Sequence, residues 1–196
     1  VEMDHSGSLP EVIEAINPEK IICSKMGHKA LVQHFHRPDW PYHVVAPGEE
    51  ISLGKHTLSF LETRMLHWPD SMFTYLKEDQ ILFTSDAFGE HLATSERFDD
   101  EVNQDVLMHE AAKYYANILT LYSPLVKKLL AKVQEMQLPI KMLAPDHGVI
   151  WRGNPGKIVE AYSRWCNHEG NGRALVIYDT MWESTKKMAK AVAEGL

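Results

Sequence analysis

Histidine and aspartate residues recur at the ends of short apolar runs in this chain, and this recurrence constrains the fold more than any other feature. His67, Asp86 and His147 each stand at the end of such a run, in three segments that lie far apart in the sequence. Loops at strand ends are where ligand-binding side chains commonly gather. The pattern therefore predicts a layered fold whose strands end at a site rich in potential metal ligands.

The first five residues strengthen this prediction. Glu2, Asp4 and His5 place two carboxylates and an imidazole within four positions. Such side chains can converge on hard or borderline metal ions when a tight turn directs them into one space. Because the chain begins at Val1, inside this motif, we expect it to be a fragment.

Composition narrows the class of protein. The 196 residues are 44% hydrophobic, which is enough for a sizeable core in one large domain or two small ones. A net charge of −7 and the lack of any Lys/Arg-rich run argue against nucleic acid or an anionic membrane as partner. No apolar run reaches the length of a membrane span, so we expect a soluble, cytoplasmic protein. Cys23 and Cys166 form no CxxC pair and are predicted to be buried, reduced thiols.

Periodicity and composition predict an α/β chain with short strands in its middle. Helical spacing predicts helices over 9–16, 29–35, 105–121, 123–136, 156–165 and 186–193. Ser8 and Glu11 match a capping box at the start of the first helix. Apolar, β-branched and aromatic runs predict strands over 20–24, 44–46, 57–62, 73–76, 81–83, 140–143 and 174–178. The segment 77–80 is predicted to be a hairpin turn, so the sheet should be antiparallel in part.

The last thirty residues have a different pattern. A polar linker over 167–173 with two glycines precedes the apolar run 174–178, which is typical of a strand buried in a parallel sheet. A hydroxyl-rich turn over 179–185 and a helix follow, an arrangement that can bind an anion through free backbone N–H groups. A plain helix N-cap at Ser184 is the alternative.

These segments together resemble a known family. Val1–His5 fits the HxExDH signature of the metallo-β-lactamase fold from its second position onward. Hydrolytic members usually carry His where this chain has Glu2, whereas the Glu form is similar to the flavodiiron proteins, or A-type flavoproteins. The turn from Thr180 to Thr185 also resembles the loop that binds the flavin phosphate in a flavodoxin-like domain.

The resemblance implies a metallo-β-lactamase-like αββα sandwich over 1–166, lacking its N-terminal part, then the linker 167–173. The first strand and helix of a flavodoxin-like, FMN-binding domain would occupy 174–196.

The resemblance also implies a di-iron site. One iron would be held by Glu2 and His67, together with the first His of the signature, which would precede Val1. The other would be held by Asp4 and His147, with His5 as a further candidate, and Asp86 would bridge the two irons. His91 could line the substrate pocket; an exposed loop histidine is the alternative.

The family's activity would then be the reduction of dioxygen to water, of nitric oxide to nitrous oxide, or of both. Electrons would come from rubredoxin or a similar donor through FMN, in a head-to-tail homodimer. The positions that match the phosphate loop are Thr180, Met181, Trp182, Ser184 and Thr185. The alternative is a zinc-dependent hydrolase of the same fold, and flavin content separates the two.

Overall fold

A five-stranded sheet lies at the centre of the computed structural model, which describes residues 1–170 and 172–196. Its strands are β3 (Glu50–Ser52), β4 (Thr57–Glu62), β5 (Met72–Leu76), β6 (Ile81–Ser85) and β7 (Met142–Pro145), in that spatial order. The first four strands pair antiparallel in sequence order, and the predicted hairpin turn at 77–80 joins β5 to β6. β7 pairs parallel with β6. The expectation of a partly antiparallel sheet is confirmed.

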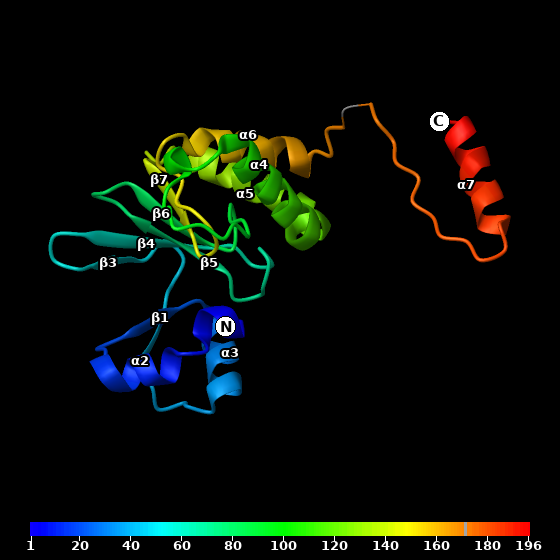
Figure 1. The fold of residues 1–196 in the computed structure, drawn as a ribbon. Coiled ribbons are helices and arrows are strands. Elements are labelled where there is room, and N and C mark those ends of the chain that lie inside the picture. Colours follow the sequence, from blue (N-terminus) through cyan, green and yellow to red (C-terminus); the bar gives the residue numbers. More distant parts are fainter. Residues whose placement is uncertain (171) are drawn as a thin grey trace.

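One face of the sheet is covered by helices (Figure 1). These are α4 (Gln104–Tyr114), α5 (Ser123–Met136) and α6 (Pro155–Cys166). Alternate residues of β5 and β6, including Phe73 and Leu82, point into a buried cluster with Leu107, Ile158 and other helix residues. Burial of this apolar surface supplies the main driving force for folding.

The predicted helix over 105–121 is one regular helix only as far as Tyr114. A π-helical turn, Tyr115–Leu119, and a 3₁₀ turn, Thr120–Tyr122, then connect α4 to α5. Apolar residues keep steps of three and four through these turns. A π turn changes the backbone hydrogen bonds, and the spacing of apolar residues does not reveal that change. The prediction of a continuous helix was therefore wrong at its end.

The N-terminal part of the chain lies below the sheet in Figure 1, away from α4–α6. It consists of α1 (Met3–Ser6), α2 (Leu9–Ile16), β1 (Ile21–Cys23), α3 (Lys25–Phe35) and β2 (Tyr42–Val44). β1 and β2 form a separate parallel pair. The bounds of α2 are as predicted, but the capping box is wrong, because the Ser8 side chain makes no capping hydrogen bond.

A short 3₁₀ turn, Asp99–Glu101, fixes the connection between β7 and α6. The buried carboxylate of Asp99 accepts the backbone N–H groups of Arg152, Gly153 and Asn154 at 2.8, 2.8 and 3.0 Å.

Both cysteines are buried and free, as predicted, and burial raises the pKa of the Cys23 thiol to about 11.

The C-terminal segment stands apart from the rest of the molecule (Figure 1). The predicted helix is present as α7 (Ser184–Glu194). The predicted strand over 174–178 is not formed, and Leu175 and Ile177 are 82% and 84% exposed. A strand of this composition needs neighbouring strands on both sides, and no described strand pairs with it. The predicted linker includes residue 171, which is outside the described residues.

In the described part of the chain, no helix is long and apolar enough to cross a membrane.

Candidate metal centre

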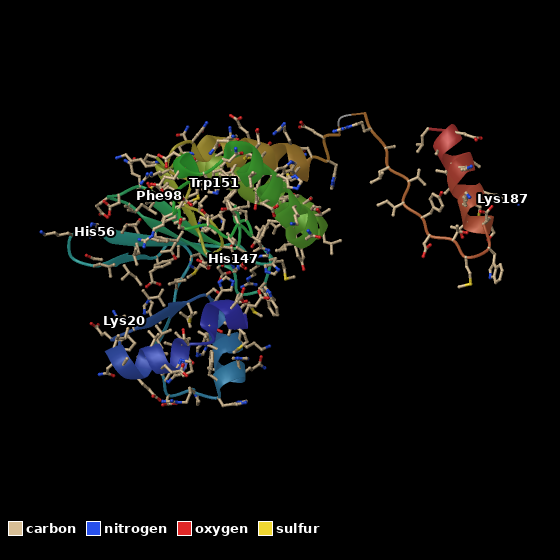
Figure 2. The ribbon with its side chains drawn as sticks, in the orientation of Figure 1. Lys20, His56, Phe98, His147, Trp151 and Lys187 are labelled. Atoms are coloured by element: carbon tan, nitrogen blue, oxygen red, sulfur yellow. The ribbon has the colours of Figure 1, made fainter. Side chains whose placement is uncertain are left out.

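Three turns and one short helix bring the predicted ligands together at one edge of the sheet. Because β6 and β7 are parallel, their carboxyl ends adjoin, and the Asp146 N–H donates to the Ser85 carbonyl at 2.8 Å. Asp86 follows β6 and His147 follows β7. His67 lies in the turn before β5, α1 supplies Asp4 and His5, and Glu2 stands at the N-cap position of α1. His147 is labelled in Figure 2, where it lies between the sheet and the N-terminal part.

Asp86 is at the centre of this arrangement. Its side chain is only 5% exposed, although it carries a carboxylate. Its Oδ1 atom lies 3.1 Å from His5 Nε2 and 3.4 Å from His147 Nε2. Its Oδ2 atom lies 3.8 Å from His67 Nε2. The two oxygens of one carboxylate therefore face different imidazoles.

The other donors fall into two groups around Asp86. The first group is Glu2 and His67, with 3.3 Å between Glu2 Oε2 and His67 Nε2. The second group is Asp4, His5 and His147, where Asp4 lies 3.3 Å from His147 Nε2 and 3.6 Å from His5 Nε2. One donor atom from each residue of the second group lies within 4.8 Å of the other two. The structure thus brings together all six predicted ligands that the chain contains.

The spacing of these donors fits metal coordination. Most of the separations between nitrogen and oxygen exceed the range of about 2.7–2.9 Å that is typical of a charge-assisted hydrogen bond. Two ligands bound to one ion at about 2.1 Å are separated by about 3.0–3.4 Å in octahedral or tetrahedral geometry. Imidazole nitrogen and carboxylate oxygen are ligands that iron and zinc accept. The donor set therefore fits two ions joined by Asp86.

Asp146, which is not among the predicted ligands, holds the His5 ring toward the centre. The His5 Nδ1 atom lies 3.2 Å from Asp146 Oδ2, while the His5 Nε2 atom faces Asp86. A carboxylate on the far nitrogen fixes the orientation and tautomer of a metal-binding histidine. Asp146 directly precedes His147, and this adjacency was the only signal in the sequence that could have identified it.

The turn that carries Asp86 is held by buried hydrogen bonds. Ser85 and Phe88 both have positive φ, at 50° and 67°, which is uncommon for residues other than glycine. The Phe88 N–H donates to Tyr162 Oη at 2.7 Å, and Trp151 Nε1 donates to the Phe88 carbonyl at 2.8 Å. Surrounding structure of this kind maintains an unfavourable backbone conformation at functional sites.

A tyrosine and a histidine border the second group. The His91 ring lies 5.4 Å from the His147 ring and 4.9 Å from the Tyr114 ring. The Tyr114 hydroxyl is buried and has no hydrogen-bond partner among the residues that the structure describes. Burial, and then the negative charge of Asp86, raise the pKa of Tyr114, so this hydroxyl keeps its proton. His91 is an exposed loop residue that also borders the site, whereas Tyr114 was predicted only as a core residue.

A second carboxyl group lies buried beside the same turns. Glu90 is fully buried, and its Oε1 atom accepts the backbone N–H of Val149 at 2.5 Å. Its Oε2 atom finds no partner in the described part of the chain. Burial raises the pKa of Glu90 to about 8. No sequence pattern marked this residue, because the contact joins positions 59 residues apart.

The predicted FMN-binding residues lie away from this centre, in the C-terminal segment. Met181 and Trp182 are each 84% exposed, and the Thr180 N–H donates to the Asp179 carboxylate at 2.7 Å. α7 begins at Ser184, with Glu183 at the N-cap position, so Ser184 is not the N-cap residue.

Known proteins are similar to this chain over its whole length. The chain is 49% identical to the "Nitric oxide reductase" of Moorella thermoacetica over 195 residues, and 43% identical to the "Rubredoxin-oxygen oxidoreductase" of Megalodesulfovibrio gigas over 197. Each alignment covers 100% of this chain and 49% of the relative, so the chain spans about half the length of these relatives.

Solved structures show the same likeness. The rubredoxin oxygen:oxidoreductase of Desulfovibrio gigas matches with a TM-score of 0.92 at 43% identity, over 98% of this chain and 49% of that one. The flavodiiron protein of Giardia intestinalis matches with a TM-score of 0.81 at 33% identity, over 97% and 46%.

A family model described as "ODP family beta lactamase" matches residues 3–148, the stretch that contains nearly all of the clustered donors. Together with the relatives, this match shows that the chain belongs to the flavodiiron protein family, on the β-lactamase-like part of its fold.

Proposed function

We propose that this chain forms the di-iron part of an enzyme that reduces dioxygen to water, nitric oxide to nitrous oxide, or both. The observation that carries the proposal is the division of the donors around Asp86 into two groups, each facing a different carboxylate oxygen. Glu2 gives the first group a carboxylate, as Asp4 does for the second, so the two groups could balance the charge of two ions that share a bridge.

In this proposal, Glu2 and His67 hold one iron, while Asp4, His147 and His5 hold the other. Asp86 bridges the two ions, and Asp146 keeps Nε2 of His5 directed at the centre. The irons, when bound, supply redox chemistry and open positions for a diatomic substrate.

Tyr114 and His91 border the substrate side of the second group in this proposal. The buried Tyr114 hydroxyl holds its proton at Oη, close to where a substrate would meet the second group. The rings of His91 and Tyr114 lie 5.4 and 6.2 Å from the His147 ring.

Electron delivery is the second part of the proposal. We infer that residues 174–196 begin a flavodoxin-like domain after the linker 167–173, with Thr180, Met181, Trp182, Ser184 and Thr185 at the FMN phosphate. The names of relatives support this inference, since solved structures that match this chain are called flavodiiron proteins and one relative is a rubredoxin-oxygen oxidoreductase. Rubredoxin or a similar carrier would be the donor, and a head-to-tail homodimer would bring the flavin of one subunit to the irons of the other.

Metal and flavin analysis tests this function directly. The chain is produced anaerobically together with any residues that flank it in its gene, and iron, zinc and FMN are quantified. The expected result is about two irons and about one FMN per chain, with consumption of dioxygen or nitric oxide when a reduced donor is supplied. Zinc without flavin, together with hydrolysis of a thioester, would instead assign the protein to the hydrolases of this fold.

A further inference from the structure

Glu90 joins the two turns that carry Asp86 and His147. Its backbone N–H donates to the His147 carbonyl at 3.3 Å, and its side chain returns to the same turn through the Val149 N–H at 2.5 Å. Two hydrogen bonds from one residue thus fasten the segment after Asp86 to the residues on either side of Gly148.

The packing around Glu90 is shaped to this contact. Gly148 has a φ of +83°, and a Cβ atom added there would lie 2.1 Å from Glu90 Oε1. Gly89 is also close, since a Cβ atom there would lie 3.2 Å from the His147 carbonyl oxygen. Two glycines therefore allow the backbones of the two turns to approach closely, and the Glu90 side chain fills the space beside Gly148.

The carboxyl group is unusual for such a buried place. Glu90 is 0% exposed and has no cationic partner in the described part of the chain. A buried polar group without full hydrogen bonding destabilises a fold, so an apolar side chain of the same size would be the more stable choice here. Unlike an apolar residue, Glu90 provides a hydrogen-bond acceptor for the Val149 N–H.

We propose that Glu90 is a positioning residue that sets the separation of Asp86 and His147, and so the metal affinity of the second group. This inference rests on the proposed metal centre. Groups that orient metal ligands through hydrogen bonds change affinity by about 10–100-fold when removed.

The test uses variants of equal size that differ in the acceptor. Glu90→Gln keeps a carbonyl oxygen for the Val149 N–H, whereas Glu90→Met fills the same volume without an acceptor. Tyr75→Phe is the matched control, because it removes one partly buried hydrogen bond, from a residue of β5 to the Pro139 carbonyl. Affinity for Co²⁺ alone is measured from its visible ligand-field absorption in the full chain, with folding checked by circular dichroism.

We expect Glu90→Met to weaken Co²⁺ binding about 10–100-fold, and Glu90→Gln and Tyr75→Phe to bind within about threefold of wild type. Two results would overturn the role of Glu90. One is a Co²⁺ affinity of Glu90→Met equal to that of wild type. The other is the same loss of affinity in Glu90→Gln as in Glu90→Met. If the wild-type chain with Co²⁺ shows no ligand-field absorption bands, the proposed metal centre itself is wrong. If Glu90→Met does not fold, hydrogen exchange of the wild-type Val149 amide decides: slow exchange supports the clamp, and exchange at the rate of an exposed loop amide contradicts it.

Discussion

Asp86 concentrates the chemistry of the candidate site in one residue. Buried carboxylates are found with cations or strong hydrogen-bond donors, because burial without them is costly. Three histidines surround Asp86, and neither of its oxygens has a Lys or Arg partner in the described residues. In the proposed centre, two metal ions would supply the positive charge that faces the Asp86 carboxylate.

Replacing Asp86 with Ala should therefore lower iron content at both positions. The change removes the shared ligand and leaves each group with one carboxylate fewer, so both ions lose charge balance and one bond. Iron per chain, measured after anaerobic reconstitution, should fall to less than about half of wild type. Asp79→Ala is the control, because Asp79 is an exposed carboxylate that pairs with His56, away from the candidate site. Unchanged iron in the Asp86 variant would rule out a bridging role.

At the scale of residues, the sequence indicated the side chains that meet at the candidate site, but not the residues that hold them in place. His67, Asp86 and His147 could be predicted because each follows an apolar run, a local signal. Asp146, Tyr114 and Glu90 could not, because their roles arise only when segments distant in the sequence meet.

Among the elements, the starts of α4 and α2 differ in their N-caps: the Asn103 side chain caps its helix, and the Ser8 side chain does not. The Asn103 side chain accepts the N–H groups of Asp105 and Val106 at 3.0 and 3.1 Å, at the start of α4. Ser8 stands at the N-cap of α2 and matches the capping pattern in sequence, but its side chain caps nothing. Pro10 follows within the first turn of α2, where it has no N–H to be capped.

Asn103→Ala should destabilise the chain by about 1 kcal/mol, because two backbone N–H groups lose their acceptor. Ser8→Ala should change stability by less than about 0.5 kcal/mol, as for most surface substitutions. Urea denaturation of both variants measures the difference in the free energy of unfolding. Equal losses in the two variants would show that the contacts of these caps do not determine helix stability.

Elements that are determined by nearby residues were predicted more accurately than elements that depend on distant parts of the chain. The bounds 9–16, 57–62 and 123–136 are correct, because amphipathic helices and a strand bounded by turns carry their signals locally. β3, with three residues, is too short to show alternation and was not predicted. The strand over 174–178 was predicted from an apolar run, but a strand forms only when other strands pair with it.

For the whole molecule, the parallel pairing of β6 and β7 determines where the site lies. It places the turns after both strands at one edge, and helices on the other side of the sheet bury the rest of these strands. The same burial encloses Glu90, so the stability of the entire fold is linked to the protonation of one side chain.

This linkage predicts how stability changes with pH in the metal-free chain. The folded-state pKa of Glu90 is raised from 4.5 to about 8 by burial, so between these values the folded chain holds a proton that the unfolded chain has lost. The stabilisation is therefore complete below pH 4.5 and is lost as the pH rises through 8. Its full size is on the order of 5 kcal/mol.

Glu90→Gln isolates this effect, because the amide is neutral at every pH. With a chelator present, the wild-type chain should lose stability relative to Glu90→Gln as the pH rises from 5 to 9, by up to about 4 kcal/mol in the free energy of unfolding. Glu135→Gln, at an exposed site on α5, should follow the wild type across the range. Parallel curves for wild type and Glu90→Gln would mean that Glu90 titrates alike in the folded and unfolded chains, and that its burial does not govern its protonation.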